Sequence, residues 1–528
     1  MPDNSPLLKS RTEKLLTLLV IAVIAAFFAV FSFINFYGFV FCASPDMYED
    51  TLVAKLMWEN KTLFPDSYIF GNQFYVAATP VLAALFYGLT GSVNTGMALA
   101  TALMSVLIFL SFIWMLRPAV KNTLCLLSGF LVLCACVFSP GIIREDRGQL
   151  FFVMCSYYAC YLITLFFVFG DYLRARNGGK VRGASLALSL LLSFAMGMQS
   201  LRQTCIMVLP LLAFEVLCLL AGFLREKRFP ECEKMPLIRV CLYAAANAAG
   251  LLLIKLLDVP HETIYTEPPY SSRLAAVWHA IRSVTGFDTV LNTKNPLFAL
   301  MFVFWAAVLL CAAYLVLFRF RKGNRALNIL WLLCLISIAA VIAASLLTSV
   351  TIRDIYLFIY FPLLALSLII VFCVAGRKGK TALVTALCLL SLCNLHLSYK
   401  DSVEHILSPA PSPGREICEY ALENGYEYVY GQDISAPLVA VWSDGKLIAG
   451  VWEKEVIFKR VPYINVSDIY TLDDYRKALF VFVDEELPQA QLEAEGSGAV
   501  LTEVGRFGTY IVCTSSKQLM YPLTWIWE

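Results

Sequence analysis

The sequence predicts an all-α polytopic membrane bundle of about 11 transmembrane helices, followed by a small α/β domain at the C-terminal end. Composition is the first reason: 59% of the 528 residues are hydrophobic, 15% are charged, and the mean hydropathy is +0.71. Soluble domains are about 45 to 50% apolar and about 25% charged. Distribution is the second reason, because apolar runs fill the chain to about residue 400 and a composition typical of soluble proteins follows. We therefore divide the chain into a transmembrane domain, residues 1–400, and a C-terminal domain, residues 401–528.

Eleven apolar runs are long enough to cross the roughly 30 Å of bilayer hydrocarbon, which takes about 20 helical residues. They cover approximately residues 15–41, 92–116, 122–140, 150–170, 183–201, 204–223, 237–257, 296–318, 327–349, 355–375 and 381–399. The first run is too long for a removable signal peptide and lacks a small-residue cleavage site, so we expect it to remain as a span.

A twelfth run, residues 74–90, is marginal in length and carries Pro80 in its middle. If it does not cross, all five basic connections between spans lie on the same side as Lys9 and Lys14, which the positive-inside rule makes cytoplasmic. We therefore expect a re-entrant or interfacial helix within a first external loop of about residues 42–91. The C-terminal domain is then extracytosolic, in a cell-membrane protein with a cytoplasmic N-terminus. The five connections hold Arg117 and Lys121; Arg174, Arg176, Lys180 and Arg182; Arg225, Lys227, Arg228 and Lys234; Arg319, Arg321, Lys322 and Arg325; and Arg377, Lys378 and Lys380.

The first external loop opens with the acidic segment SPDMYED. Ser44 and Pro45 are typical of a helix start. The negative charge of Asp46 in the first turn would interact favourably with the helix dipole. An apolar stripe at helical spacing then predicts a helix that lies along the bilayer interface. That stripe consists of Leu52, Val53, Leu56 and Met57. Such a helix would hold the carboxylates of Asp46, Glu49 and Asp50 at a fixed depth beside the membrane.

Other polar side chains fall on the same external side. The second external loop has Glu145 and Asp146 flanked by arginines, and the later loops add further groups. The candidate substrate-binding residues are Arg144, Arg147, Arg202, His261, Arg353 and Tyr356. A carboxylate beside the membrane can deprotonate an acceptor hydroxyl or hold a divalent ion. A guanidinium there can clamp a phosphate. The alternative is that these are ordinary loop charges, whose surface pairs stabilise little.

These motifs together resemble the GT-C superfamily of membrane glycosyltransferases. The resemblance rests on SPDMYED in the first external loop, REDR in the second, the late stretch RDIYLFIYFPLLAL, and GYEYVYGQDISAPLVAVWSDGKL in an external C-terminal domain. It implies a GT-C-like fold and a donor that carries its sugar on a polyprenyl phosphate. The acceptor would be an extracytosolic glycan, lipid or protein. Attack from the face opposite the phosphate would invert the anomeric centre.

Residue by residue, the resemblance implies that Asp46 is the first-loop catalytic aspartate, with Glu49 and Asp50 as the next acids on the same helix. Glu145 or Asp146 matches the second-loop acid. The stretch that contains Arg353 and Tyr356 implies a phosphate contact there. The second loop reads Glu-Asp-Arg where the familiar pattern is Asp-x-Asp, so the involvement of a divalent cation stays open. The sugar stays open too.

The tail should form a small α/β unit. We expect helices in GREICEYALENG and DISAPLVAVWSDG, and strands in YEYVYG, KLIAGVWE, ALFVFVDEE and TYIVCTSS. Cys418 and Cys513 are the two cysteines of the tail, and they could pair in an oxidising compartment.

A transporter or flippase for lipid-linked glycans is the alternative function. Glu215 and Asn247 lie inside predicted spans, where ionisable and polar groups often mark translocation paths. The sequence has no inverted repeat to support that alternative. A net charge of +2 without a long basic block sets nucleic acid aside as a partner.

Overall fold

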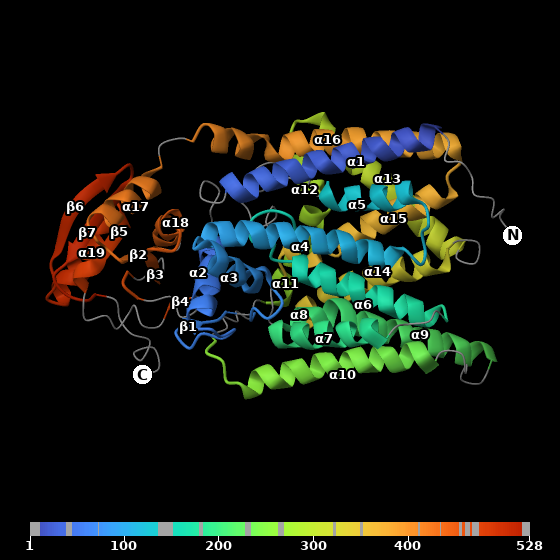
Figure 1. Cartoon of the computed structure of the whole chain (residues 1–528), viewed down its shortest axis with the longest axis horizontal. Coiled ribbons are helices and arrows are strands. Elements are labelled where there is room, and N and C mark those ends of the chain that lie inside the picture. The colour runs from blue at the N-terminus through green and yellow to red at the C-terminus, as the bar shows by residue number, and fades with distance from the viewer. Residues whose placement is uncertain are drawn as a thin grey trace.

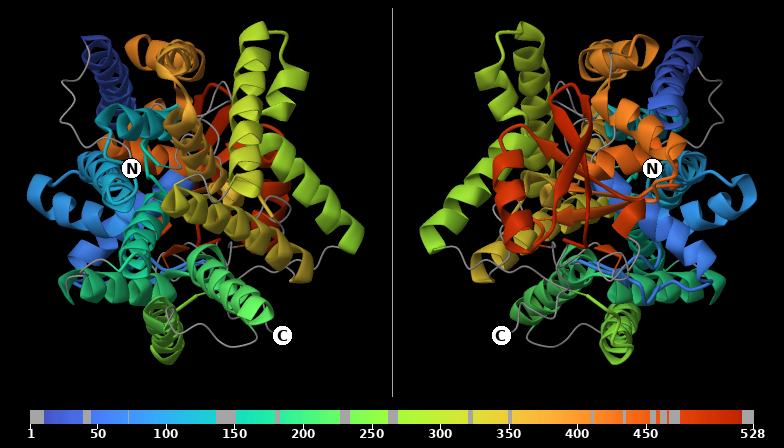
Figure 2. Two further views of the ribbon diagram at one scale, coloured as in Figure 1. Left: turned by 90° about the vertical axis from the view of Figure 1, so that its right-hand side faces the viewer. Right: turned by 90° about the vertical axis from the view of Figure 1, so that its left-hand side faces the viewer.

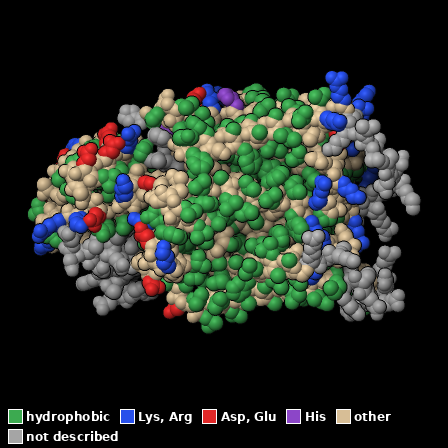
Figure 3. Space-filling view, viewed as in Figure 1, with side chains coloured by type: hydrophobic (Ala, Val, Ile, Leu, Met, Phe, Trp, Pro, Cys, Tyr) green, Lys and Arg blue, Asp and Glu red, His purple; other side chains and the backbone are tan. Residues whose placement is uncertain are grey.

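Figure 1 presents the computed structural model of the chain, an elongated bundle of helices with a sheet at one end. The structure describes residues 11–38, 45–71, 73–135, 151–178, 183–226, 234–261, 269–319, 324–348, 352–409, 412–432, 435–452, 457–459, 465–466 and 475–519. A broad band of hydrophobic side chains covers the middle of the bundle (Figure 3). An apolar surface of this extent is typical of contact with lipid, so the chain is a membrane protein.

Eight of the described segments are long and apolar enough to cross a membrane. They are Arg11–Gly38 (α1, Arg11–Phe33, and η1, Ile34–Gly38), Val93–Leu116 (α4), Leu201–Leu224 (α8, Leu201–Gln203; η3, Thr204–Val208; α9, Leu209–Glu226), Met235–Leu256 (α10, Lys234–Leu256), Pro296–Phe318 (α13), Arg325–Leu347 (α14), Asp354–Val374 (η5, Asp354–Leu357; α15, Tyr360–Val374) and Arg377–Leu407 (α16).

The other three predicted spans contain helices that fall short of this threshold, so the predicted total of 11 is not confirmed. They are α5 (Thr123–Cys134), α6 (Ala159–Arg176) and α7 (Gly183–Gln199). The helix α6 begins later than the expected residue 150, because residues 151–158 form turns with Met154 and Ser156 at φ values of 57° and 49°. Residues 136–150, which follow α5, lie outside the described residues.

The starts of α1, α5 and α16 meet at one end of the bundle. Asn122 Nδ2 donates a hydrogen bond to Glu13 Oε1 at 2.9 Å, just before α5. Arg377 Nη2 donates to Thr12 Oγ1 at 3.3 Å. Lysine and arginine gather at this end in Figure 3, and we call it the basic end. Its exposed basic residues include Arg11, Lys14, Arg117, Lys121, Arg325, Arg377 and Lys378. The opposite end, which carries the sheet, is the sheet end.

Two short helices precede α4 at the sheet end. The first, α2 (Pro45–Glu59), begins at Pro45, as the sequence predicts. Its apolar stripe is buried, with Val53 at 0% and Met57 at 4% exposure. The sequence suggested that this stripe would face the bilayer interface, but protein covers it, because α3 (Thr79–Thr90), α4 and α18 (Ala436–Trp442) pack on α2. With 12 residues, α3 is about 18 Å long.

The described residues between 412 and 519 form what we call the C-terminal unit, a five-stranded sheet with three helices. The strand order is β3-β2-β5-β7-β6, with β2 parallel to β3 and β5, and β7 antiparallel to β5 and β6. The right-hand view of Figure 2 has this sheet in front of the helix bundle. The elements are α17 (Pro413–Glu423), β2 (Tyr428–Gln432), α18, β3 (Ile448–Trp452), β5 (Ala478–Val483), α19 (Leu487–Gly496), β6 (Leu501–Phe507) and β7 (Tyr510–Ser515).

All six elements expected in the tail are present in this unit, whereas α19 and β6 were not predicted. Both missed segments are rich in polar residues and carry weak periodicity. Stacked aromatic rings fill the core of the unit, with the Trp452 and Phe482 centroids 5.3 Å apart. Cys418 and Cys513 are both buried free thiols in the structure, and burial raises the pKa of each to about 11.

The C-terminal unit is joined to the membrane domain both through the chain and through space. The helix α16 has 31 residues, a length of about 46 Å, and it continues past the end of α1 toward the sheet (Figure 1). Residues 408–412 connect it to α17. Through space, β1 (Tyr68–Ile69) of the first loop pairs antiparallel with β4 (Asn465–Val466). At the start of α4, Asn94 N donates to Asp444 Oδ1 at 2.9 Å.

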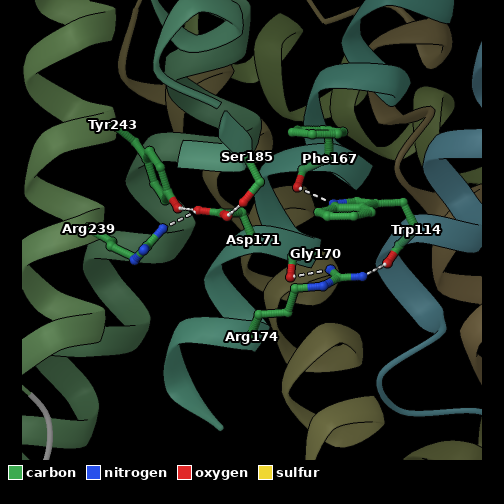
Figure 4. Close-up of polar contacts among 8 residues, drawn as sticks. All are labelled: Trp114, Phe167, Gly170, Asp171, Arg174, Ser185, Arg239 and Tyr243. Atoms are coloured by element: carbon green, nitrogen blue, oxygen red, sulfur yellow. Dashed lines mark hydrogen bonds and ion pairs between the residues drawn. The ribbon is translucent and has the colours of Figure 1, made fainter. Parts of the chain in front are cut away.

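Near the basic end, a buried ion pair joins α6 to α10. The carboxylate of Asp171 is 0% exposed and accepts from Arg239 Nη1 at 2.6 Å and from Ser185 Oγ at 2.6 Å. The hydroxyl of Tyr243 donates to the same carboxylate. Figure 4 shows the side chains of Ser185, from α7, and of Arg239 and Tyr243, from α10, converging on Asp171 of α6. These donors compensate the cost of removing a carboxylate from water.

Candidate functional site

An acidic cluster lies where α2 faces the segment that follows β1. Asp50 is 1% exposed, and its carboxylate lies beside the hydroxyl of Tyr75. Burial raises the pKa of the Tyr75 hydroxyl well above its ordinary value, and the charges of Asp50 and Glu49 raise it further. Burial likewise raises the pKa of Tyr68, with Glu49 and Asp50 next in effect. Both tyrosines therefore stay protonated at neutral pH and can donate hydrogen bonds toward the acids.

A caged arginine forms the second part of the site. Arg202 lies in α8, and its guanidinium carbon is 4.8 Å from the ring centroid of Tyr158, 5.3 Å from that of Tyr161 and 4.7 Å from that of Tyr356. The helix starts at Ser200, whose hydroxyl accepts from Arg202 N at 3.1 Å. A guanidinium that contacts ring faces is held by cation–π attraction, while its N–H groups point outward in its own plane. Such an edge is suited to a phosphate.

The segment 73–77 borders both parts. Gln73 Oε1 accepts from the hydroxyl of Tyr161 at 3.3 Å. The side chain of Gln199, at the end of α7, accepts from Val76 N at 3.3 Å and from Ala77 N at 3.1 Å. Gln73 and Tyr75 are two residues apart, so their Cα atoms lie within about 7.6 Å. A short, well-anchored segment therefore separates the acidic cluster from the caged arginine.

The segment around η5 brings a second arginine to this region. Arg353 is exposed and directly precedes η5, which carries Tyr356 of the cage. Asp354 fixes this segment, because its carboxylate accepts from Ser283 Oγ at 2.7 Å and from Ile355 N at 2.8 Å. Ser283 belongs to α11 (Tyr270–Val284), so the long loop after α10 supports η5. Arg353 thus lies three residues from a ring that contacts Arg202.

His261 also lies beside the segment 73–77. Its ring makes an edge contact with Phe74 at a centroid distance of 5.5 Å. Its Nδ1 is 2.8 Å from Val259 O, and Phe70 N donates to Pro260 O at 2.9 Å. The exposed His261 therefore lies at the rim of the site, held by the backbone around it.

The structure describes part of the predicted set of site residues. Glu49 and Asp50 lie in α2, Arg202 lies in α8, His261 follows α10, Arg353 directly precedes η5, and Tyr356 lies in η5. Asp46 lies in α2 one turn before Asp50, and its side chain is outside the described part of the chain. The second-loop residues Arg144, Glu145, Asp146 and Arg147 lie outside the described residues. Within the described ranges, no group of three or more His, Cys, Asp and Glu side chains is arranged to hold a metal ion.

Sequence reasoning missed the tyrosines and glutamines that organise this region. Tyr75 lies beside Asp50, Tyr158 and Tyr161 surround Arg202, and Gln199 anchors the segment 73–77. The available signal was the position of Gln199 and Arg202 in the predicted external connection between two spans. Neutral donors there carry no charge pattern, so nothing in the sequence connected them with the acids of the first loop.

The two span residues that favoured a transporter are paired inside the protein. Glu215, at 0% exposure, accepts hydrogen bonds from Tyr172 and Arg176 and forms an ion pair with Arg176. Asn247 accepts from Thr204 Oγ1 at 2.6 Å and donates to the backbone carbonyl of Ser193 at 3.1 Å. Each residue thus joins neighbouring helices.

No family model matches the sequence, and no curated protein matches it. Solved structures do match. They include ArnT from Cupriavidus metallidurans in the apo state, with a TM-score of 0.53, and the same protein bound to undecaprenyl phosphate, with a TM-score of 0.55. In each case the sequence identity is 13%, and the match covers 95% of this chain and 99% of the ArnT chain. The chain therefore shares the fold of ArnT.

Proposed function

We propose that this chain is an integral membrane glycosyltransferase that moves a sugar from a polyprenyl-phosphate-linked donor to an extracytosolic glycan, lipid or protein. One observation carries the proposal: the acidic cluster at Asp50 and the caged arginine Arg202 border the same anchored segment, residues 73–77. An acid that can accept a proton then lies near a cation that can hold a phosphate. The fold shared with ArnT, a protein that binds undecaprenyl phosphate, supports a lipid-linked donor.

In this proposal the acids of α2 act on the acceptor. Asp46, Glu49 and Asp50 share two turns of one helix, and one of them removes the proton as the acceptor hydroxyl attacks the anomeric carbon. Attack from the side opposite the phosphate inverts that carbon. The resemblance of the SPDMYED motif favours Asp46 as the base, with Asp50 and Glu49 next. Glu145 or Asp146 would supply the second-loop acid.

The arginines act on the leaving group. As the glycosidic bond breaks, negative charge develops on the lipid phosphate, and preoriented donors stabilise it. Arg202 and Arg353 are proposed for this role, as are Arg144 and Arg147 of the second loop. Tyr356 holds Arg202 in place through its ring, and His261 would contact the sugar or the acceptor at the rim.

For the orientation, we propose that the sheet end is extracytosolic and the basic end cytoplasmic. The support is the gathering of lysine and arginine at the basic end (Figure 3), which is the charge bias of cytoplasmic connections. The first external loop would then comprise residues 42–91, with α3 as a re-entrant or interfacial helix. Residues 401–528 would form an extracytosolic domain of a cell-membrane protein.

The experiment uses the full chain in lipid nanodiscs with a panel of undecaprenyl-phosphate sugars that carry radiolabelled hexoses or pentoses. We expect release of label from the lipid and its transfer to an envelope acceptor fraction, with loss of transfer in Asp46→Asn. Movement of an intact labelled lipid between leaflets without bond cleavage would overturn the proposal in favour of a flippase. Absence of both activities across the panel would also count against it.

A further inference from the structure

We propose that the C-terminal unit sets the rotation of α2 about its own axis, with Tyr48 and Lys55 as positioning residues for the carboxylates of Glu49 and Asp50. This inference rests on the proposed function, because it assigns those carboxylates to the reaction. It gives the C-terminal unit a defined role, which is to fix the direction in which the acids of α2 point.

The first anchor is Tyr48. Its hydroxyl oxygen accepts from Ala449 N at 2.7 Å, and its O–H donates to Ala449 O at 3.3 Å. Ala449 belongs to β3, the edge strand of the sheet, and edge strands carry backbone groups that need partners. Tyr48 is 4% exposed, and burial raises the pKa of its hydroxyl, so the group remains a donor. One side chain of α2 thus serves both backbone groups of an edge-strand residue.

The second anchor is Lys55. Its Nζ donates to Gly445 O at 2.6 Å. Gly445 has a φ of 76°, and a Cβ there would lie 3.0 Å from Val93 Cγ2 and 3.5 Å from Lys55 Cδ. The turn therefore fits closely between α2 and α4, and glycine suits it both for conformation and for space. The bond from Lys55 reaches a backbone carbonyl, which moves with the sheet.

The spacing of the two anchors restricts rotation. Tyr48 and Lys55 are seven residues apart on one helix, which is two turns, about 10 Å along the axis and about 20° around it. They therefore lie on the same face and both attach to the C-terminal unit. Asp50 is two residues after Tyr48, about 200° around the helix, so it points away from the sheet toward Tyr75.

A small rotation would matter for the acids. A side-chain atom about 5 to 6 Å from the helix axis moves by ~2 Å when the helix turns by 20°. A misplacement of about 1 Å at a reacting centre can cost ~10²-fold in rate. The bonds of Tyr48 and Lys55 to the C-terminal unit oppose this rotation.

The chain offers a matched control in Asn94. This residue also binds the C-terminal unit, through Nδ2 to Val441 O at 3.1 Å, but it belongs to α4. Asn94→Ala weakens docking of the unit without touching α2. Tyr48→Phe and Lys55→Met weaken docking and release α2, while both keep most of the buried apolar surface. Lys55→Arg keeps a donor for Gly445 O.

The test measures sugar transfer and hydrogen exchange on the full chain in nanodiscs. For Tyr48→Phe and Lys55→Met we expect kcat to fall by 10-fold or more, donor KM to stay within 3-fold, and amide exchange over residues 45–59 to accelerate. Lys55→Arg should recover most of the rate, and Asn94→Ala should stay within 2-fold. Equal losses in Asn94→Ala and Tyr48→Phe, or unchanged kcat and exchange in both anchor variants, would overturn the inference. If the wild type transfers no sugar, the proposed function fails, and exchange over residues 45–59 still decides whether the unit holds α2.

Discussion

The hydroxyl of Tyr75 lies beside the carboxylate of Asp50, and the two residues are 9% and 1% exposed. A protonated hydroxyl in this place can donate to a carboxylate that water hardly reaches, and so hold the direction of that carboxylate. Tyr75→Phe should therefore lower kcat by roughly 10-fold or more, because a hydrogen bond to a charged group contributes about 1.5 to 3 kcal/mol. Steady-state transfer assays check this, with thermal unfolding to verify that the variant folds. A wild-type kcat would exclude Tyr75 from orienting the acid.

The acids of α2 can be separated by amide substitution. Asp46→Asn keeps the size and much of the capping ability of the side chain, so it isolates the base. We expect transfer to fall by at least ~10²-fold, as is typical for loss of a general base, while donor binding changes little. The parallel variants Asp50→Asn and Glu49→Gln should lose less. If Asp46→Asn keeps its activity, the base moves to whichever of the two parallel variants shows the large loss.

Arg202→Lys retains the positive charge and loses the planar group that the three tyrosine rings hold. We expect donor KM to rise by about 10-fold, because lysine cannot present a fixed pair of donors to the phosphate. Arg319 offers a control, since its guanidinium carbon lies 5.9 Å from the ring centroid of Tyr314 on α13. Arg319→Lys should leave KM unchanged. Equal effects of the two substitutions would remove Arg202 from the phosphate site.

Substitutions at Asp171 measure how much its buried ion pair stabilises the membrane domain, independently of the candidate functional site. Asp171→Ala leaves the charge of Arg239 buried without its partner, which should cost about 3 to 5 kcal/mol. Ser185→Ala removes one neutral donor to the same carboxylate and should cost about 1 kcal/mol. Thermal unfolding in detergent ranks the two variants. Comparable transition temperatures for both would show that this ion pair contributes little to stability.

The proposed orientation predicts which ends react with a membrane-impermeant thiol reagent in intact cells. Leu492 in α19 is 65% exposed, and Lys378 is exposed at the start of α16. Leu492→Cys should be labelled from outside, and Lys378→Cys only after the cells are opened. Labelling of both from outside would contradict the assignment of the basic end to the cytoplasm.

Helices and strands could be predicted from the sequence because they depend on local pattern. The start of α2 at Pro45 could be predicted because proline favours the first position of a helix. The apolar stripe of α2 was assigned to the wrong surroundings for the same reason. An apolar stripe such as Val53 and Met57 has the same sequence pattern whether lipid or protein covers it. Periodicity identifies the apolar face of a helix but not what packs against that face.

The contacts of the candidate site could not be predicted, because they join distant parts of the chain. Arg202 meets Tyr356 across more than 150 positions, and the bond between Tyr48 and Ala449 spans 401. One sequence contains no information on which helices lie side by side. The acids and arginines stood out by their charge, whereas Tyr75 and Gln199 are neutral and became visible only through packing.

The length of α16 bears on how firmly the C-terminal unit stays in place. This helix extends past the end of α1 toward the sheet, and only residues 408–412 separate it from α17. A tether this short gives an effective concentration in the millimolar range or higher at the docking surface. Contacts too weak to hold a free protein therefore suffice here, which explains how a two-residue ladder between β1 and β4 can contribute. An insertion of flexible residues between Ser408 and Ser412 would lower the effective concentration of the C-terminal unit at its docking surface. The unit would then dissociate from α2 while remaining on the same chain.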